Sequence, residues 1–210
     1  MKRFQMITEA DARVLDYGST VTLVPGGHVT PLAQDTLKAR RISVVREGTN
    51  VDVLSLAPPA DIKVVAIASD HTGVALKQTI RQHLRSRGVA VHDLGTDTSE
   101  PVDYPDMAAA VARQVARGEA DAGIVIDGAG LGSTIAANKI RGVRAAMCLN
   151  QTLARYARQH NGANVLALGS TLVSPADAVE IVNVFVETPM REARYIRRLA
   201  KIADLERSPE

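Results

Sequence analysis

The fold of this chain is decided by residues 124–139, which read IVIDGAGLGSTIAANK. The apolar run Ile124–Ile126 is typical of the end of a buried strand, and Asp127 follows it directly. Three alternating glycines then predict a loop whose backbone approaches a ligand closely, and short side chains open a helix. Free N–H groups at a helix start favour an anion, and open α/β sheets bind ligands at the carboxyl ends of strands. The segment therefore predicts an anion site with a candidate base, Asp127, beside it.

Strand and helix patterns alternate outward from this segment, from Lys63 to the end of the chain. The predicted strands are residues 64–68, 89–94, 124–126, 145–149 and 165–168, and the predicted helices are 74–87, 106–117, 134–139, a segment running through 158, and the remainder from 175. Continuous apolar strands that alternate with helices indicate a parallel sheet covered on both faces.

The first part of the chain has a different texture. Residues 19–25 read as a short strand ending at Pro-Gly-Gly, and Thr30-Pro31 starts a helix that runs through 41. Residues 42–45 are a second predicted strand, and some strand character recurs at 51–56. We divide the chain into a small α+β extension over residues 1–50, a linker over 51–62 and a main domain over 63–210.

Composition narrows the classes of function. With 210 residues the chain can bury one sizeable core. Aromatic residues are only 3% and the net charge is +2, which argues against a nucleic-acid partner. The single cysteine, Cys148, excludes an internal disulfide and fits a reducing compartment. No apolar run reaches membrane-spanning length and no signal core follows the N-terminus, so we expect a cytoplasmic protein without a membrane partner.

Six motifs carry a family likeness: SDHTG at 69–73, DYP at 103–105, the glycine loop through 139, GVRAA at 142–146, RQHN at 158–161 and NVL at 164–166. In this order and spacing, residues 63–205 resemble the ribose-5-phosphate isomerase B and galactose-6-phosphate isomerase family. The resemblance implies a Rossmann-like three-layer α/β/α sandwich with a parallel sheet. It also implies dimers or tetramers with active sites shared between subunits, and aldose–ketose isomerisation through an enediol without metal or cofactor.

The resemblance also suggests roles for single residues. His160 becomes the ring-opening acid and base, with Asn161 beside it on the substrate. Asp70 and His71 contact the sugar and the phosphate, and Arg194 and Arg198, four apart on one helix face, bind the phosphate with His71. The loop at Gly128, Gly130, Gly132 and Ser133 binds the substrate, and its N–H groups stabilise the enediolate.

Structural interpretations stand beside these roles. His160 alternatively caps carbonyls at a helix end, and Asp70 or Thr72 alternatively caps the helix that follows them. The two arginines alternatively form a solvated face that pairs with Glu192 or Asp204.

Four positions differ from residues that members of the family carry. Asp127 stands where many members have a cysteine as base, and Ser133 stands where others have a glutamate. Asp127 replaces that base if burial raises its pKa; alternatively it orients the loop through backbone N–H groups, with a lowered pKa. Ala129 replaces a serine or threonine, which costs only a side-chain contact. Thr171 replaces an arginine that binds phosphate, which weakens phosphate affinity or changes the substrate.

The first 45 or so residues carry a second likeness, through ITEA at 7–10, the VTLVP strand, LAQD at 32–35 and RRI at 40–42. They resemble the N-terminal segment of the ethanolamine-utilisation cobalamin adenosyltransferase, which implies that residues 1–50 dock to the shell or core of a bacterial microcompartment.

From the likeness of residues 63–205 we expect an isomerase with ribose 5-phosphate as default substrate. The alternatives are another four- to six-carbon phosphosugar, a partner-dependent subunit, or a non-catalytic scaffold.

Overall fold

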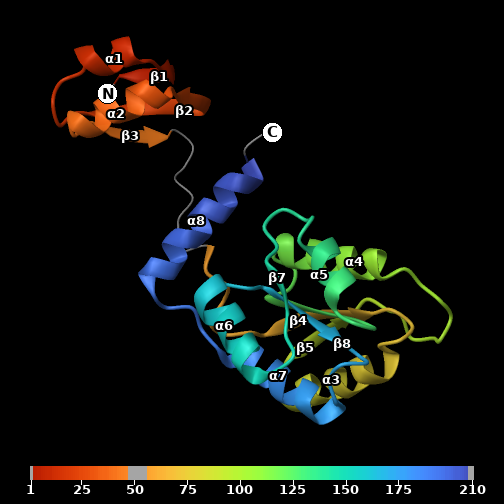
Figure 1. The fold of residues 1–210 in the computed structure, drawn as a ribbon. Coiled ribbons are helices and arrows are strands. Elements are labelled where there is room, and N and C mark those ends of the chain that lie inside the picture. Colours follow the sequence, from red (N-terminus) through yellow and green to blue (C-terminus); the bar gives the residue numbers. More distant parts are fainter. Residues whose placement is uncertain (1, 47–55, 208–210) are drawn as a thin grey trace. The chain divides into compact units, whose positions relative to one another are not determined.

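A computed structural model describes residues 2–46 and 56–207. The described residues fall into two compact units, one over residues 2–46 and one over residues 56–207 (Figure 1). Residues 51–55 of the predicted linker lie outside the described residues, and with them all but Leu56 of the strand character expected at 51–56.

The first unit alternates strands and helices around its own core. Its elements are β1 (Arg3–Ile7), α1 (Glu9–Val14), β2 (Thr20–Val29), α2 (Pro31–Ala39) and β3 (Ser43–Arg46). The strands form a parallel sheet in the order β1-β2-β3, and Ile7, Leu23 and Leu37 lie in the core. As predicted, Thr30 caps α2 and Pro31 occupies its first turn. The sequence prediction missed β1 and α1.

The strand predicted to end at Pro25 continues instead to Val29 as β2. Its pairing with β1 shifts register between Phe4 and Met6, because the Pro-Gly-Gly segment bulges out and the strand then resumes. At Gly27 a Cβ atom would lie 2.7 Å from the carbonyl oxygen of Gln5, so only glycine allows this close approach.

The second unit is the predicted α/β domain. Its elements are β4 (Val64–Ser69), α3 (Val74–Ser86), β5 (Ala90–Asp93), α4 (Tyr104–Ala116), β6 (Ala122–Asp127), α5 (Leu131–Ala137), β7 (Ala145–Met147), α6 (Gln151–Asn161), β8 (Val165–Gly169), α7 (Pro175–Glu187) and α8 (Ala193–Arg207). The five strands form one sheet in the order β5-β4-β6-β8-β7, and every pair is parallel. The predicted parallel α/β fold is therefore confirmed.

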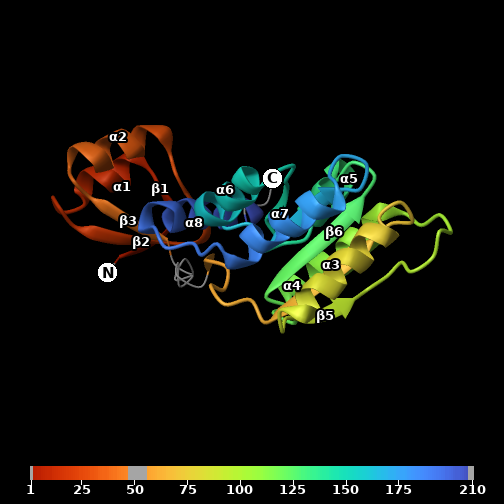
Figure 2. The same ribbon diagram turned by 90° about the horizontal axis from the view of Figure 1, so that it is seen from below.

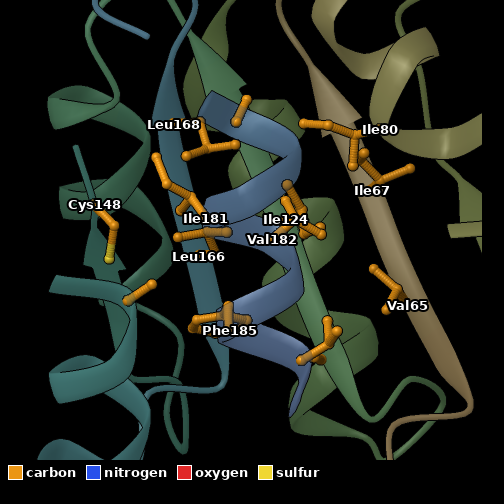
Figure 3. Packing of buried hydrophobic residues seen from close by; sticks show 14 of the residues in the cluster. Val65, Ile67, Ile80, Ile124, Cys148, Leu166, Leu168, Ile181, Val182 and Phe185 are labelled. Carbon is orange, nitrogen blue, oxygen red and sulfur yellow. The ribbon is translucent and has the colours of Figure 1, made fainter. Parts of the chain in front are cut away.

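Each face of this sheet is covered by its own apolar cluster, because successive strand residues point to opposite faces. Ile124 and Leu166 pack under α7 with Phe185, as Figure 3 shows, and α3 and α6 add to the same side. Val125 packs on the other side with Val111 of α4. These layers confirm the α/β/α sandwich. In the described ranges no helix is long and apolar enough to cross a membrane.

Helix boundaries differ from the prediction where they affect the site. The helix expected from 175 onward is two helices, since α7 ends at Glu187 before Pro189 and α8 begins at Ala193. Helix α6 extends beyond 158, which places His160 and Asn161 in its last turn. Helices α6 and α8 lie side by side (Figure 1 and Figure 2).

Candidate functional site

The loops after β4, β6 and β8 meet at the carboxyl edge of the sheet. Ser69 pairs with Ile126, and Asp127 pairs with Gly169, so the three strands end at the same level. The backbone N–H of Ser170 donates to the carbonyl oxygen of Asp127 at 2.8 Å. This edge therefore brings together Asp70, His71, Asp127 and the glycine loop, as open α/β sheets do at their binding sites.

The glycine loop is built around the carboxylate of Asp127, which is 5% exposed. One oxygen accepts from the N–H groups of Ala129, at 2.8 Å, and of Gly130. The other accepts from the N–H of Ser133 at 2.9 Å, and the Ser133 hydroxyl also hydrogen-bonds to this carboxylate.

These contacts determine the ionisation of Asp127. Burial by itself raises the pKa of this carboxyl, but the hydrogen bonds from Ser133, Gly130 and Ala129 outweigh it and leave the pKa lowered. Of the two alternatives from the sequence, the raised pKa is therefore wrong, and the loop-orienting carboxylate with a lowered pKa is the one the structure supports. The structure also places Ser133, 1% exposed, behind the loop as a support for Asp127.

Fewer backbone N–H groups of the glycine loop are available to a substrate than we expected from the sequence. Ala129, Gly130 and Ser133 donate to Asp127, while the N–H groups of Leu131 and Gly132 have no partner among the described residues. Both belong to the first turn of α5, where N–H groups lack intrahelical acceptors. These two N–H groups are available to donate to an anionic oxygen.

Two glycines are required by close approach. A Cβ atom on Gly132 would lie 2.5 Å from the Tyr104 ring, and one on Gly169 would lie 2.8 Å from the Ala129 backbone. Thr171, at the position expected to weaken phosphate binding, hydrogen-bonds through its hydroxyl to the carbonyl oxygen of Gly128 at 2.6 Å. The loop is thus held from both sides by the neighbouring segments.

Asp70 and His71 each have a defined hydrogen bond. One oxygen of Asp70, Oδ1, accepts from the Thr72 N–H at 2.8 Å and from the Thr72 hydroxyl at 2.6 Å. Helix α3 has Gly73 as its N-cap and no side-chain cap, so the capping alternative for Asp70 is wrong. Nδ1 of His71 accepts from the Val102 N–H at 3.4 Å. In the neutral ring this bond leaves the proton on Nε2.

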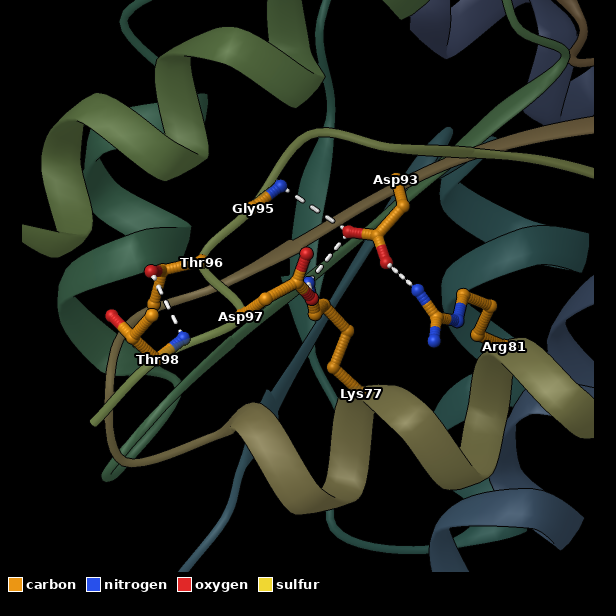
Figure 4. A network of polar contacts seen from close by, with 7 residues as sticks. All are labelled: Lys77, Arg81, Asp93, Gly95, Thr96, Asp97 and Thr98. Carbon is orange, nitrogen blue, oxygen red and sulfur yellow. Dashed lines mark hydrogen bonds and ion pairs between the residues drawn. The ribbon is translucent and has the colours of Figure 1, made fainter.

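An ion-pair network holds the loop that supplies Val102 (Figure 4). The fully buried Nζ of Lys77 lies 2.6 Å from Asp93 and 2.9 Å from Asp97, and Arg81 pairs with the other oxygen of Asp93 at 2.6 Å. The same carboxylate accepts from the Gly95 N–H at 3.2 Å. Burial alone would raise the pKa of Asp93, but these cations and the N–H lower it.

The remaining predicted residues lie together where α6 and α8 meet. His160 lies between the rings of Tyr156 and Tyr195, with centroid distances of 4.7 and 4.5 Å. The guanidinium groups of Arg194 and Arg198 lie 4.6 and 5.5 Å from the Tyr195 centroid. The predicted alternative pairing of Arg194 with Glu192 is present at 2.6 Å. Gly162 caps α6, and His160 caps no carbonyl within the described part of the chain.

Asn161 belongs to the same end of α6, and its side-chain amide donates to the carbonyl oxygen of Tyr156 at 3.3 Å. It lines a hollow of about 440 Å³ together with Arg144, Ile202 and Leu205. Neither tyrosine beside His160 was predicted from the sequence as part of the site. Tyr156 precedes His160 by four residues and Tyr195 follows Arg194, so helical spacing and adjacency were the available signals.

The glycine-loop residues and the cluster around His160 lie at opposite ends of the strands, the carboxyl edge and the amino edge of the sheet. His160 and Asn161 precede β8, whose first residue, Val165, pairs with Gly123, whereas Asp127 pairs with Gly169 at the far end. Four residues of strand span about 13 Å. One chain therefore does not bring His160, Arg194 and Arg198 to the glycine loop. No cluster of three or more metal-ligating side chains occurs in residues 2–46 and 56–207.

Comparison with known proteins adds a family to this geometry. The family model described as Ribose/Galactose Isomerase matches residues 65–202. Ribose-5-phosphate isomerase B of Escherichia coli is 44% identical over 145 residues, which cover 69% of this chain and 97% of that protein.

Solved structures give the same result. The Clostridium thermocellum ribose-5-phosphate isomerase B has a TM-score of 0.67 at 46% identity, covering 68% of this chain and 97% of that one. The Mycoplasma genitalium ribose-5-phosphate isomerase B with bound ribulose 5-phosphate has a TM-score of 0.67 at 40% identity, covering 70% and 97%.

Proposed function

The chain belongs to the ribose/galactose isomerase family, and from this membership we propose that it interconverts ribose 5-phosphate and ribulose 5-phosphate. It is an aldose–ketose isomerase of sugar phosphates. The observation that carries the proposal is the glycine loop at the carboxyl edge, with the N–H groups of Leu131 and Gly132 open to an anionic oxygen. Such donors stabilise the enediolate between aldose and ketose.

Two carboxylates at this edge are candidates for moving the proton between C1 and C2, and their hydrogen bonding separates them. Both oxygens of Asp127 are occupied by loop donors, which makes it a weak base. Oδ2 of Asp70 accepts no hydrogen bond from the residues that the structure describes. We therefore assign Asp127 to support of the loop and Asp70 to the proton transfer.

The remaining roles follow the chemistry of each group. His160 has both ring nitrogens free of partners in the described chain, which suits a ring-opening acid and base, and Asn161 lies beside it. Arg194 and Arg198 bind the phosphate, since guanidinium groups match its geometry. His71, with its proton on Nε2, donates one more hydrogen bond to the substrate.

A complete site requires two copies of the chain in this proposal. The loop of one copy receives His160, Asn161, Arg194 and Arg198 of another, because one chain holds these groups at opposite edges. Exposed apolar side chains near the carboxyl edge support such self-association: Leu131, Ile135, Leu149, Leu153 and Leu172 are 43–62% exposed. A homodimer or tetramer satisfies this requirement.

Proton NMR in heavy water, with a panel of aldose and ketose phosphates of four to six carbons, tests the activity. We expect ribose 5-phosphate and ribulose 5-phosphate to interconvert, with deuterium entering at C1 or C2. Faster turnover of another phosphosugar, for which Thr171 is the motivating departure, would reassign the substrate. Absence of turnover and exchange across the panel, from folded protein, would favour a partner-dependent or non-catalytic role.

For residues 1–50 we propose docking to the shell or core of a bacterial microcompartment. The separate core of this unit supports the proposal, because a compact unit can serve as a docking module independently of the site. The test compares the full chain with a variant lacking residues 1–50 for partitioning into purified shells. Equal partitioning of the two proteins would contradict docking through this unit.

A further inference from the structure

Tyr195 connects the proposed ring-opening group with the proposed phosphate ligands. It lies in the first turn of α8 and is 8% exposed. Its ring packs against His160 at a centroid distance of 4.5 Å with the planes inclined by 31°. The guanidinium groups of Arg194 and Arg198 lie over the same ring. Three functional side chains thus share one buried neighbour.

Both arginines depend on this ring for their placement. Nη2 of Arg194 donates to the Tyr195 hydroxyl at 2.9 Å, in addition to its ion pair with Glu192. Arg198 has no hydrogen bond or ion pair with any described residue, so its contact with the ring is the interaction that orients it. The negative face of an aromatic ring attracts a guanidinium group.

The orientation of His160 depends on the same ring. Tyr156 stacks on it from the other side, with the planes inclined by 16°, but Tyr156 is 48% exposed. The buried Tyr195 is therefore the better-fixed wall. Stacking between two rings defines the plane of the imidazole and leaves its nitrogens at the open edge.

We propose that Tyr195 is a positioning residue that holds His160 at a set distance from Arg194 and Arg198. This inference rests on the proposed function. A sugar whose phosphate engages the arginines then has its ring oxygen at the imidazole edge, so ring opening follows from phosphate binding. The fixed spacing selects sugars by the distance between phosphate and ring oxygen.

Two substitutions at this position separate the two contacts. Tyr195→Phe keeps the ring and removes the hydroxyl, so we expect kcat from ribose 5-phosphate to stay within about twofold. The KM and the inhibition constant of inorganic phosphate should rise about fivefold, the effect of one lost hydrogen bond to a charged group. Tyr195→Leu removes the ring, and misplacement of the acid should lower kcat by about tenfold to a hundredfold.

Deuterium exchange at C1 of ribulose 5-phosphate isolates ring opening from proton transfer. This ketose is open-chain, because its C5 oxygen carries the phosphate, so exchange requires no ring opening. At saturating ketose we expect Tyr195→Leu to reduce exchange much less than it reduces aldose turnover. Equal reduction of both rates would overturn the proposal.

Leu199→Ala is the matched control. Leu199 lies in the same apolar cluster as Tyr195, but it has no aromatic ring with which to stack on His160 or to hold the guanidinium groups. If it reproduces the changes of Tyr195→Leu, Tyr195 merely anchors the helix and the proposal is wrong. Titration with inorganic phosphate, followed by NMR, keeps the test independent of turnover. If the wild-type protein isomerises no substrate, the proposed function fails. Weaker phosphate binding by Tyr195→Phe than by the wild-type protein would still support the positioning of the arginines by Tyr195. Unchanged phosphate binding by Tyr195→Phe would overturn that positioning.

Discussion

A buried carboxylate at the end of a strand serves as a base or as a scaffold according to how many donors it faces. Asp127 faces the N–H groups of Ala129, Gly130 and Ser133 together with a hydroxyl, whereas Asp70 keeps one oxygen free. At the scale of single residues, the number of donors around each carboxylate therefore separates the one that supports the loop from the one that keeps an oxygen open to substrate.

Replacing Asp127 by Asn should destabilise the fold at neutral pH by about 2–4 kcal/mol, because an amide donor would face N–H donors. The folded pKa of Asp127 lies below its unfolded value, so its stabilisation is complete above about pH 4 and disappears as the pH falls through the folded pKa. The difference between the two proteins should thus shrink in acid. Urea unfolding at neutral and acidic pH measures it.

The control for this substitution is Asp61→Asn, since the Asp61 side chain is 82% exposed and we expect a change within about 0.5 kcal/mol. A destabilisation by Asp127→Asn that is equal at both pH values would contradict the proposed ionisation.

At the scale of elements, α3 is tied to the loop after β5 by a buried cation. Replacing Lys77 by Met should cost about 3 kcal/mol of unfolding free energy, because Asp93 is mostly buried and loses its fully buried cationic partner on α3. Arg81→Met should cost less, since Arg81 is 26% exposed and Asp93 keeps Lys77 and the Gly95 N–H. Urea unfolding compares the two; a larger loss for Arg81→Met would refute this account of the network.

The junction of β8 and the glycine loop depends on the lack of a side chain at Gly169. Its replacement by Ala should lower the free energy of unfolding by about 1–3 kcal/mol, because the new Cβ meets the Ala129 backbone. Gly128→Ala is the control: its nearest neighbour would be the Thr72 hydroxyl at 3.8 Å, so we expect a loss under about 1 kcal/mol. Thermal or urea unfolding distinguishes the two variants. Equal losses of unfolding free energy would contradict this account, because they would mean that the Ala129 backbone moves aside without cost.

At the scale of the whole molecule, the proposed site needs two chains, which predicts complementation. Asp70→Asn and His160→Ala variants, each nearly inactive because one lacks the proposed proton-transfer carboxylate and the other the proposed ring-opening imidazole, are mixed in equal amounts and allowed to exchange subunits. In a two-fold symmetric dimer half of the molecules are mixed, and one of their two sites is intact, so about a quarter of wild-type activity should return. Isomerase assay before and after exchange measures this; no gain over the separate variants would place each site within one chain.

Local sequence patterns were sufficient to predict the strands of the second unit, but they were insufficient to predict those of the first unit. Strands β4, β6 and β8 are continuous apolar runs, so their burial on both faces is visible in the sequence. Strand β1 buries only Ile7, and β2 crosses a Pro-Gly-Gly segment that normally ends a strand. Both are held by pairing with each other, which no local pattern reports.

The parallel fold and the carboxyl-edge location of Asp70, His71 and Asp127 were predictable from local sequence, because a residue's place at a strand end depends only on its neighbours in the chain. Tertiary structure alone decided that the pKa of Asp127 is lowered, that Tyr195 joins His160 to two arginines, and that this cluster lies at the opposite edge. Ionisation and side-chain contact depend on groups that folding brings together from distant positions.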